Sequence, residues 1–485
     1  MRRLTAVLAA AMLAACGGTT NTPDGGTGGG TSGTGGGSSG TGGGTSGTGG
    51  GTAAPGNIVE VASANADFST LVAAVTKAGL ASTLADTTKQ YTVFAPTNAA
   101  FAALLTRLGA ASLDDLSAEQ LAPILKYHVL ATKVEAAAAT TAAMANMKVD
   151  AIGGKIQLSL QGSTIRLDGT ASVTAANVAA SNGVIHVIDQ VILPSALDIA
   201  STDPRFSSLT AAAAKAGLGA TLDDDALATR LTIFAPTNDA FTALVNALKG
   251  SDNGASTGID ALEDFSAAQL LPVVAYHVLP SPVFSKDVPA SANVASNGGQ
   301  LAVAKSGASV TVDGVPVVVA DIVASNAVIH AVGSVLVPSI TDVVTTRAEF
   351  SSLKAAVLAA DGAMGTTPKV AAALDGTANF TLFAPSNAAF TALGTAPTGQ
   401  ALTQVLLYHA LPGNPVYAAT ALALTSPLTA ATALTGKTVA VNAEGTPKGV
   451  TVADSTATKA NVTEVNFFCS NGVIHTVDKV LIPSP

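Results

Sequence analysis

The sequence contains few charged residues, few aromatic residues and almost no cysteine. Of its 485 residues, 11% are charged and 4% are aromatic, and there are two cysteines and no tryptophan. A typical globular domain has about 25% charged residues, so we expect a surface made largely of Ala, Thr, Ser, Gly and Asn. Two cysteines exclude a disulfide framework and a thiolate metal site.

Positive charge is also scarce. The chain has 23 basic and 32 acidic side chains, a net charge of -9, and no cluster of Lys or Arg. Because such a chain repels phosphate backbones, we expect no nucleic-acid partner. The length allows about three domains of roughly 100–200 residues, each large enough to bury its own core.

The N-terminus has the features of an export signal, which we assign to residues 1–16. Two arginines precede an apolar run, Leu4–Ala15, that is too short to span a bilayer. Residues Leu13–Cys16 resemble the bacterial lipobox, which implies cleavage before Cys16 and lipidation of its thiol. The alternative is an ordinary signal peptide cut nearby. Because Gly17 follows instead of aspartate, we expect export and a lipid anchor in the outer membrane or at the cell surface.

Residues 17–56 form a Gly/Ser/Thr-rich segment in which 20 of 40 residues are glycine. Such a chain cannot bury enough apolar area to offset the entropy lost on ordering, so we expect a disordered tether. Its mean span as a flexible coil is roughly 35 Å.

After the tether, three blocks of sequence occur three times in the same order. The first block reads TVFAPTNAAF, TIFAPTNDAF and TLFAPSNAAF, starting at Thr92, Thr232 and Thr381. The second block is a Tyr-His pair, and the third reads Asn, Gly or Ala, Val, Ile, His. The third-block histidines are separated by 144 and 145 residues, which is too long for a solenoid repeat. We therefore predict three tandem domains: domain 1 (57–194), domain 2 (195–338) and domain 3 (339–485).

Three sets of residues recur in these blocks and are the candidate site residues. They are the first-block asparagines Asn98, Asn238 and Asn387, the pairs Tyr127-His128, Tyr276-His277 and Tyr408-His409, and the third-block histidines His186, His330 and His475.

The three blocks together resemble the fasciclin domain, and the resemblance covers nearly everything after the tether. It implies an α+β fold in which a helical layer packs on a β-wedge. It also implies extracellular modules of cell adhesion and matrix organisation that have no established catalytic chemistry. In this family the Tyr-His motif has been implicated in adhesion.

The first block reads as a corner between a strand and a helix. A short apolar strand, Tyr91–Ala95, ends at Pro96, whose ring blocks further strand pairing. Thr97 or Asn98 then caps a helix, and we expect the asparagine to satisfy backbone groups and not a ligand. The helix has an apolar stripe at helical spacing: Phe101, Leu104, Leu105 and Leu108.

The Tyr-His block places each histidine on the apolar face of a helix. In domain 1 this face consists of Leu121, Ile124, Leu125 and His128, at i, i+3, i+4 and i+7. The last carbonyls of a helix lack intrahelical partners, so a histidine there is well placed to donate a hydrogen bond. We expect a buried histidine that locks the helix end. The alternative is that Tyr and His line a surface that binds a partner.

The third block reads as a hairpin turn followed by an apolar strand, Val184–Ile192. On a strand, an odd offset points His186 and Asp189 to opposite faces. This spacing counts against a metal-binding or catalytic His-Asp pair.

No other pattern indicates catalysis or a cofactor. Each domain has two histidines, but no carboxylate recurs near both, so we expect no metal, no cofactor and no enzyme activity. Domain 2 carries two acidic runs, Asp223–Asp225 and Asp260–Asp264, which we interpret as solvated loops, with weak calcium binding as the alternative.

The second cysteine, Cys469, lies just before the third-block turn of domain 3. Its default interpretation is a small buried residue. If Cys16 is acylated, Cys469 is the remaining free thiol, and an oxidising compartment would allow a thiol-linked dimer.

These features together predict a surface-anchored adhesion or matrix-binding lipoprotein. The lipid anchor would join it to the membrane, and the fasciclin-like modules would bind a protein or polysaccharide at the cell surface or in the matrix. The alternative is a periplasmic or outer-membrane receptor that binds a lipid or polysaccharide in one domain, with the other domains as spacers.

Overall fold

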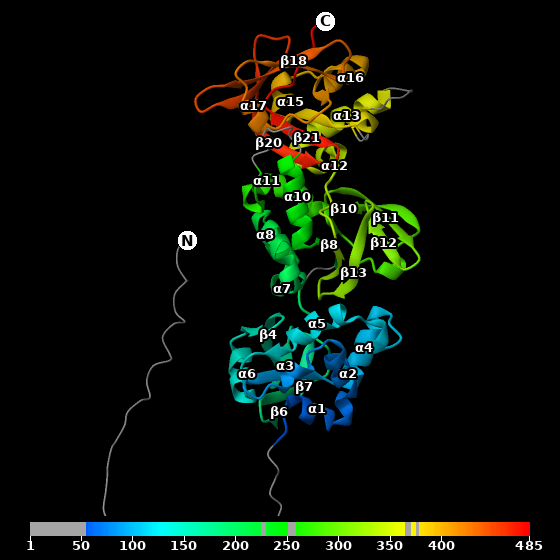
Figure 1. Cartoon of the computed structure of the whole chain (residues 1–485), viewed down its shortest axis with the longest axis vertical. Helices are drawn as coiled ribbons and strands as arrows, with labels where there is room; N and C mark the ends of the chain where they lie inside the picture. Colours follow the sequence, from blue (N-terminus) through cyan, green and yellow to red (C-terminus); the bar gives the residue numbers. More distant parts are fainter. Residues whose placement is uncertain (1–54, 225–228, 251–258, 364–369, 375–377) are drawn as a thin grey trace, which may run out of the picture. The chain divides into compact units, whose positions relative to one another are not determined.

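The computed structural model describes residues 55–224, 229–250, 259–363, 370–374 and 378–485 (Figure 1). Within the chain, Ala54–Pro485 form one compact unit. The predicted signal peptide, the predicted lipidation site Cys16, residues 17–54 of the predicted tether and Asp225 of the acidic run lie outside the described residues.

Each domain is built on a seven-stranded sheet, and the three sheets have the same connectivity. In domain 1 the strand order is β2-β1-β7-β6-β5-β4-β3. Along the chain, the first strand of each domain pairs in parallel with the last one. These pairs are β1 with β7, β8 with β14 and β15 with β21. The strands of domain 1 are β1 Tyr91–Pro96, β2 Val129–Leu130, β3 Lys148–Ala151, β4 Gly154–Gln161, β5 Thr164–Leu167, β6 Ala171–Ala180 and β7 Gly183–Ile188.

The other two sheets repeat this arrangement. The strands of domain 2 are β8 Leu231–Pro236, β9 Val278–Leu279, β10 Ser291–Ser296, β11 Gly299–Ser306, β12 Ser309–Val312, β13 Val315–Val323 and β14 Ala327–Val332. Those of domain 3 are β15 Phe380–Pro385, β16 Ala410–Pro412, β17 Leu428–Ala431, β18 Thr438–Glu444, β19 Gly449–Ala453, β20 Ala460–Cys469 and β21 Gly472–Val477.

Helices precede the sheet and follow its first strand in each domain. Those of domain 1 are α1 Ile58–Ser63, α2 Ser69–Lys77, α3 Ala81–Ala85, α4 Asn98–Leu108, α5 Ala118–Tyr127 and α6 Ala136–Met144. Those of domain 2 are α7 Ala196–Thr202, α8 Ser207–Lys215, α9 Gly219–Leu222, α10 Asn238–Gly250 and α11 Ala267–Tyr276. Those of domain 3 are α12 Ile340–Thr346, α13 Ser351–Ala363, α14 Val370–Leu374, α15 Asn387–Leu393, α16 Gly399–Tyr408 and α17 Ala418–Leu422.

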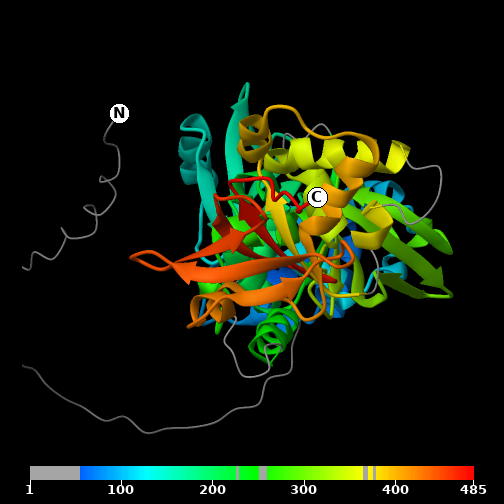
Figure 2. The ribbon, with the colours of Figure 1, turned by 90° about the horizontal axis from the view of Figure 1, so that it is seen from above.

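The helices and the strands lie on different sides of each domain. Figure 1 shows α8, α10 and α11 gathered beside the strands β10 to β13 of domain 2, and in Figure 2 the yellow helices of domain 3 lie apart from its orange strands. The predicted α+β fold is therefore confirmed.

The sheet separates two apolar cores in each domain because its central strands are buried on both faces. In domain 1, Val93 and Ile185 pack with the helices, whereas Phe94 and Ile188 pack with α6 and the outer strands. Alternate residues of a strand point to opposite faces, so the unbroken apolar runs of β1 and β7 serve both cores.

The apolar stripes that the sequence predicts are confirmed, with one difference. Phe101, Leu104 and Leu108 are buried on α4, whereas Leu105 is only partly buried. The side chain of Thr97, and not that of Asn98, caps this helix by accepting a hydrogen bond from the N–H of Ala100 at 3.3 Å.

The third block forms the predicted hairpin, but its strand is shorter than the sequence indicates. β6 and β7 are antiparallel and turn between Ala180 and Gly183. β7 ends at Ile188 instead of Ile192 because its parallel neighbour β1 ends at Pro96, directly opposite. Beyond that point β1 offers no partner, and one further backbone hydrogen bond runs from the N–H of Asp189 to the carbonyl of Ser172 in β6.

The asparagine of this turn connects the hairpin to the helical layer. Asn182 is fully buried, its Oδ1 accepts from the N–H of Ile58 at 2.9 Å, and its Nδ2 donates to the carbonyl of Leu84 at 2.8 Å. Asn326 and Asn471 make the same pair of contacts, to Ala196 and Leu222 and to Ile340 and Leu374.

Replacing Asn182 with alanine would leave buried backbone groups at both α1 and α3 without partners. We expect Asn182→Ala to lower the free energy of unfolding of domain 1 by about 2–4 kcal/mol. Native-state hydrogen exchange of domain 1 measures this loss. Ser163→Ala, at an exposed turn position of domain 1, is the control, with an expected change within about 0.5 kcal/mol. Equal effects of the two substitutions would contradict this role of Asn182.

Candidate functional site

The histidine of each Tyr-His pair is the residue that ends a helix. His128, His277 and His409 are the C-cap residues of α5, α11 and α16 and are at most 2% exposed; we call them the helix-end histidines. In each ring Nδ1 lies 2.7–2.8 Å from the carbonyl oxygen four residues earlier, which belongs to Ile124, Val273 or Val405.

The other nitrogen of each helix-end histidine holds the segment that follows the last strand of the domain. Nε2 accepts a hydrogen bond from the backbone N–H of Ile192 at 3.1 Å, Leu336 at 2.9 Å or Leu481 at 2.8 Å. Each ring therefore fastens the end of a helix to a chain segment 59–72 residues away.

These partners fix the protonation state of the ring. A carbonyl oxygen only accepts and a backbone N–H only donates, so Nδ1 carries the proton, Nε2 carries a lone pair and the imidazole is neutral. Burial lowers the pKa of His128, His277 and His409 to about 4 because the charged form would lose its hydration.

The third-block histidines are buried on the last strand of each sheet, and we call them the hairpin histidines. Nε2 of His186, His330 and His475 lies 2.7–2.9 Å from a carbonyl oxygen, that of Val134, Val283 and Val416 respectively. Each ring lies 5.6–5.7 Å, centroid to centroid, from a phenylalanine of the neighbouring strand: Phe94, Phe234 and Phe383.

The hairpin histidines have the opposite tautomer. Their Nδ1 accepts from the N–H of Asn177, Asp321 or Asn466, at 3.3, 3.2 and 3.4 Å. The proton is therefore on Nε2, which donates to the valine carbonyl. Burial lowers the pKa of His475 to about 4 and also lowers the pKa of His330.

The residues that donate to Nδ1 of the hairpin histidines were not predicted from the sequence. Asn177, Asp321 and Asn466 have φ of 59, 58 and 56° at irregularities in the pairing of β6, β13 and β20. Their side-chain oxygens accept hydrogen bonds from the N–H of Ala136, Ser285 and Ala418. Each of these residues begins the short helix that follows the second strand of its domain. Each lies nine residues before its hairpin histidine, a recurrence visible in the sequence once the repeats are aligned.

A buried threonine of the first strand completes this framework and was also missed. Thr92, Thr232 and Thr381 are fully buried, and each hydroxyl accepts at 2.7–2.8 Å from the N–H of the valine whose carbonyl the hairpin histidine holds. The same valine residue is therefore fixed at both its N–H and its C=O.

The tyrosine of each pair also faces inward. The hydroxyl of Tyr127 lies 3.0 Å from both the carbonyl of Lys155 and a carboxylate oxygen of Asp168. Tyr276 has equivalent contacts with Gln300 and Asp313, and Tyr408 donates to the carbonyl of Thr438 at 2.8 Å. All three tyrosines are at most 4% exposed, so their side chains are enclosed within their domains.

The first-block asparagines connect two helices. Oδ1 of Asn98 accepts from the N–H of Thr70 at 2.9 Å, and Nδ2 donates to the carbonyl of Ala66 at 2.9 Å. Asn238 and Asn387 hold the corresponding groups of Ser208 and Pro204, and of Ser352 and Ala348. These side chains join the start of the first-block helix to the start of an earlier one.

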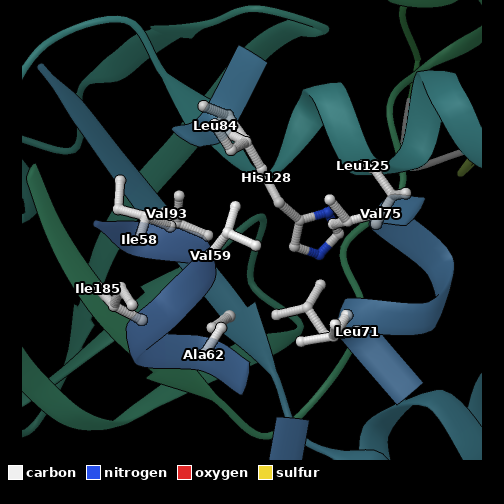
Figure 3. A pocket seen from close by; sticks show the side chains of 13 residues that line it. Ile58, Val59, Ala62, Leu71, Val75, Leu84, Val93, Leu125, His128 and Ile185 are labelled. Carbon is white, nitrogen blue, oxygen red and sulfur yellow. The ribbon is translucent and has the colours of Figure 1, made fainter. Parts of the chain in front are cut away.

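An apolar cavity of about 30 Å³ adjoins the helix-end histidine of domain 1. Figure 3 shows the imidazole of His128 among the side chains of Leu71, Val75 and Val59, and aliphatic residues line the rest of the wall. This volume exceeds the roughly 10–15 Å³ that one water needs, but an apolar cavity offers water no polar partners.

The described part of the chain contains no cluster of three or more His, Cys, Asp or Glu side chains that would hold a metal ion. In the acidic domain 2, Asp223 forms a 3.4 Å ion pair with Lys148 of domain 1. Asp264 accepts from the N–H groups of Asp260 and Ala261, which lowers its pKa. Asp223 and Asp264 therefore have structural partners within the chain.

Cys469 is partly buried at the end of β20, and its sulfur lies 3.6 Å from the carbonyl oxygen of Phe467. Desolvation raises the pKa of this thiol well above its ordinary value, which disfavours the reactive thiolate. The thiol-linked dimer stays a prediction.

Comparison with known proteins identifies the family. The model of the fasciclin domain matches residues 66–194, 204–338 and 355–483. Since these matches cover most of the chain, the chain belongs to the fasciclin family. Within the described residues no helix is long and apolar enough to cross a membrane.

Individual relatives match parts of the chain. Protein sll1483 of Synechocystis is 44% identical over 137 residues, which cover 28% of this chain and 73% of that protein. Transforming growth factor-beta-induced protein ig-h3 of Oryctolagus cuniculus is 31% identical over 189 residues, 38% of this chain and 26% of that protein. A solved fasciclin domain pair from the insect cell adhesion molecule fasciclin I covers 59% of this chain and is itself 96% covered, with 17% identity and a TM-score of 0.28.

The neutral buried histidines predict acid sensitivity. Four of them, His128, His277, His409 and His475, have a folded pKa of about 4, below the ordinary value of 6.5, so the unfolded chain binds more protons between these values. Their stabilising contribution is complete above about pH 6.5 and is lost as the pH falls toward 4, by up to about 1.4 kcal/mol per pH unit for each ring.

Urea unfolding at a series of pH values measures this effect. The window from about pH 6.5 to 5 isolates the histidines, because ordinary carboxyl groups titrate below it. A free energy of unfolding that stays constant across this window would contradict the assignment of buried neutral rings.

Substitutions in a Tyr-His pair distinguish a scaffold role from a contact role. We expect His128→Ala to cost domain 1 about 3–5 kcal/mol, because it enlarges a cavity and leaves Ile124 and Ile192 without their buried hydrogen bonds. Tyr127→Phe removes one hydroxyl, with an expected cost of about 1–2 kcal/mol. Hydrogen exchange of domain 1 measures both. Loss of partner binding by either variant at unchanged stability would indicate a contact role instead.

Proposed function

We propose that this chain is an adhesion or matrix-binding lipoprotein of the cell surface that acts through its three fasciclin domains without catalysing a reaction. The proposal combines membership of the fasciclin family with two features of the sequence. These are the lipobox ending at Cys16 and the Gly/Ser/Thr-rich tether of residues 17–56. The tether would place the domains away from the membrane that holds the acyl chains.

The observation that carries the proposal is the burial of the same two histidines and the same tyrosine in all three domains. Every ring nitrogen of these histidines is engaged by a backbone group. Because these groups are engaged within each domain, the framework supports a role as a rigid scaffold. Binding is then the task of the exposed loops and helix faces, where the three domains differ in sequence.

The repetition of the domain supports adhesion because linked weak sites raise the effective concentration at a partner. The partner we propose is a protein or polysaccharide at the cell surface or in the matrix. The receptor alternative receives no support from the cavity beside His128, since about 30 Å³ is far below the roughly 300–1,000 Å³ of ligand pockets.

The two cysteines of the chain offer a matched pair for testing the lipid anchor. We expect Cys16→Ser to move the protein from the membrane fraction to the soluble fraction, because the serine cannot receive the thioether-linked lipid. Cys469→Ser retains Cys16 and is expected to stay in the membrane fraction. A Cys16→Ser protein that fractionates with the membrane would contradict the proposed anchor.

Protease treatment of intact cells tests which side of the membrane the domains occupy. We expect the protein to be digested on whole cells, whereas a periplasmic marker stays intact. Deletion of the gene should then reduce cell-cell or cell-surface adhesion, and expression of the unaltered chain should restore it. A protected protein, or unaltered adhesion in the deletion strain, would contradict the proposal.

A further inference from the structure

The contacts between neighbouring domains use the same positions of the repeat at both junctions. Gln120 is the third residue of α5, and its Nε2 donates to the carbonyl of Ala320 in β13 at 2.9 Å. Gln269 has the same place in α11, and its Nε2 lies 3.1 Å from the carbonyls of Val465 and Asn466 in β20. In each case the helix that carries the Tyr-His pair contacts the strand irregularity of the following domain.

The orientation of each glutamine follows from its second task. Oε1 of Gln120 and of Gln269 accepts from the N–H of the helix-capping serine, Ser117 or Ser266, at 2.7 Å. With the oxygen engaged in the capping box, the amide nitrogen is directed at the next domain. The capping hydrogen bond therefore fixes the direction in which the side-chain amide of each glutamine donates.

An apolar residue just before the capping serine accompanies the glutamine. Phe265 packs edge to face against Phe468 of domain 3, with ring centroids 5.6 Å apart. At the first junction the corresponding residues are Leu116 and Val323, which share one buried core cluster. Phe468 and Val323 occupy equivalent strand positions, because they pair with Val473 and Val328 at the same point of the hairpin.

The start of α16 in domain 3 and the irregular part of β6 in domain 1 correspond to the two sides of these junctions. Neither carries the residues that make the contact. Counted back from the helix-end histidine, Pro397 of domain 3 has the position of Leu116 and Phe265. Ala401 has the position of Gln120 and Gln269. In domain 1 the strand position of Val323 and Phe468 is occupied by Ala179, and residues 174–177 of the irregular segment are exposed. Domain 3 thus lacks the docking helix start, and domain 1 lacks the apolar strand residue.

We propose that Leu116 with Gln120 and Phe265 with Gln269 are the specificity determinants of a head-to-tail docking surface that fits the strand irregularity of another fasciclin domain. The absence of these residues from domain 3, together with Ala179 in domain 1, prevents a second copy of the chain from docking at either surface. The repeat pairs with its own neighbour and not with other copies. This inference does not depend on the proposed function.

A second hydrogen bond recurs at both junctions and fixes how the two domains are aligned. Oδ1 of Asp198 accepts from the N–H of Lys155 at 3.1 Å, and Oδ1 of Asp342 accepts from that of Gln300 at 2.9 Å. Gly154 and Gly299 precede these amides, and a Cβ on either would lie 2.3 Å from the aspartate carboxyl carbon. Domain 3 has a longer turn at the corresponding place, with residues 432–437 between its paired strands.

Gln269→Glu tests the docking helix without disturbing its cap. Glutamate keeps an oxygen for the N–H of Ser266 and is favourable in the first turn of a helix. It replaces the donor to Val465 and Asn466 with a carboxylate oxygen, which their carbonyls repel. In the full chain we expect hydrogen exchange in residues 463–468 to become about tenfold faster, the change that 1.4 kcal/mol produces.

The matched control is Gln404→Glu, an exposed position on α16 of domain 3, where no change in exchange is expected. Protection of the α11 amides in Gln269→Glu shows that the helix itself remains folded. Unchanged exchange in residues 463–468 of Gln269→Glu would overturn the docking role of the glutamine.

Sedimentation equilibrium of the full chain tests the exclusion of second copies. In a reducing buffer, which removes any thiol-linked dimer, we expect a monomer whose mass does not change with concentration. Head-to-tail growth that Ala176→Arg abolishes, by placing a large side chain on the exposed irregular segment of domain 1, would overturn the proposal. Ala138→Arg on exposed α6 is the control for added bulk and charge.

Discussion

Each domain depends on two imidazole rings that are buried in the neutral state. Each ring bridges one backbone carbonyl and one backbone N–H from separate segments. A neutral imidazole is suited to this task because it offers one donor and one acceptor on a single rigid ring. Burying these four backbone groups without partners would cost several kcal/mol. Burying a charged ring would cost more, which is why desolvation moves the pKa of His128 to about 4.

The two rings of a domain do complementary work because their tautomers are opposite. The helix-end histidine protonates Nδ1 and joins the end of a helix to the segment after the last strand. The hairpin histidine protonates Nε2 and joins the last strand to the segment that follows the short second strand. The two histidines and the tyrosine of each domain are almost fully buried, which favours a role in holding the fold.

The sequence predicted those features that depend on local periodicity. The face of Leu121, Ile124 and Leu125 with a histidine at its end is correct because a helix of fixed pitch dictates which positions are buried. The hairpin was predicted because its turn and its continuous apolar strand are local features of the sequence. The expected strand extended too far, to Ile192, because its end is decided by where β1 stops and not by its own composition.

Features that depend on contacts between distant segments could not be predicted. Asn177, Asp321 and Asn466 differ in identity and act through a backbone N–H and a positive φ, which composition does not reveal. Gln120 and Gln269 read as ordinary capping residues, and only the structure shows their amides reaching strands about 200 residues away. Alignment of the three repeats would have drawn attention to these positions but not to their partners.

The central claim is that all six imidazoles are neutral and divided into two tautomeric sets. The ¹⁵N chemical shifts of the histidine rings at neutral pH measure this directly, since protonated and bare ring nitrogens differ strongly. The account predicts three rings protonated at Nδ1 (His128, His277 and His409) and three protonated at Nε2 (His186, His330 and His475), with no change when zinc is added. A ring that is charged at neutral pH, that exchanges between tautomers or that shifts on binding zinc would contradict the account.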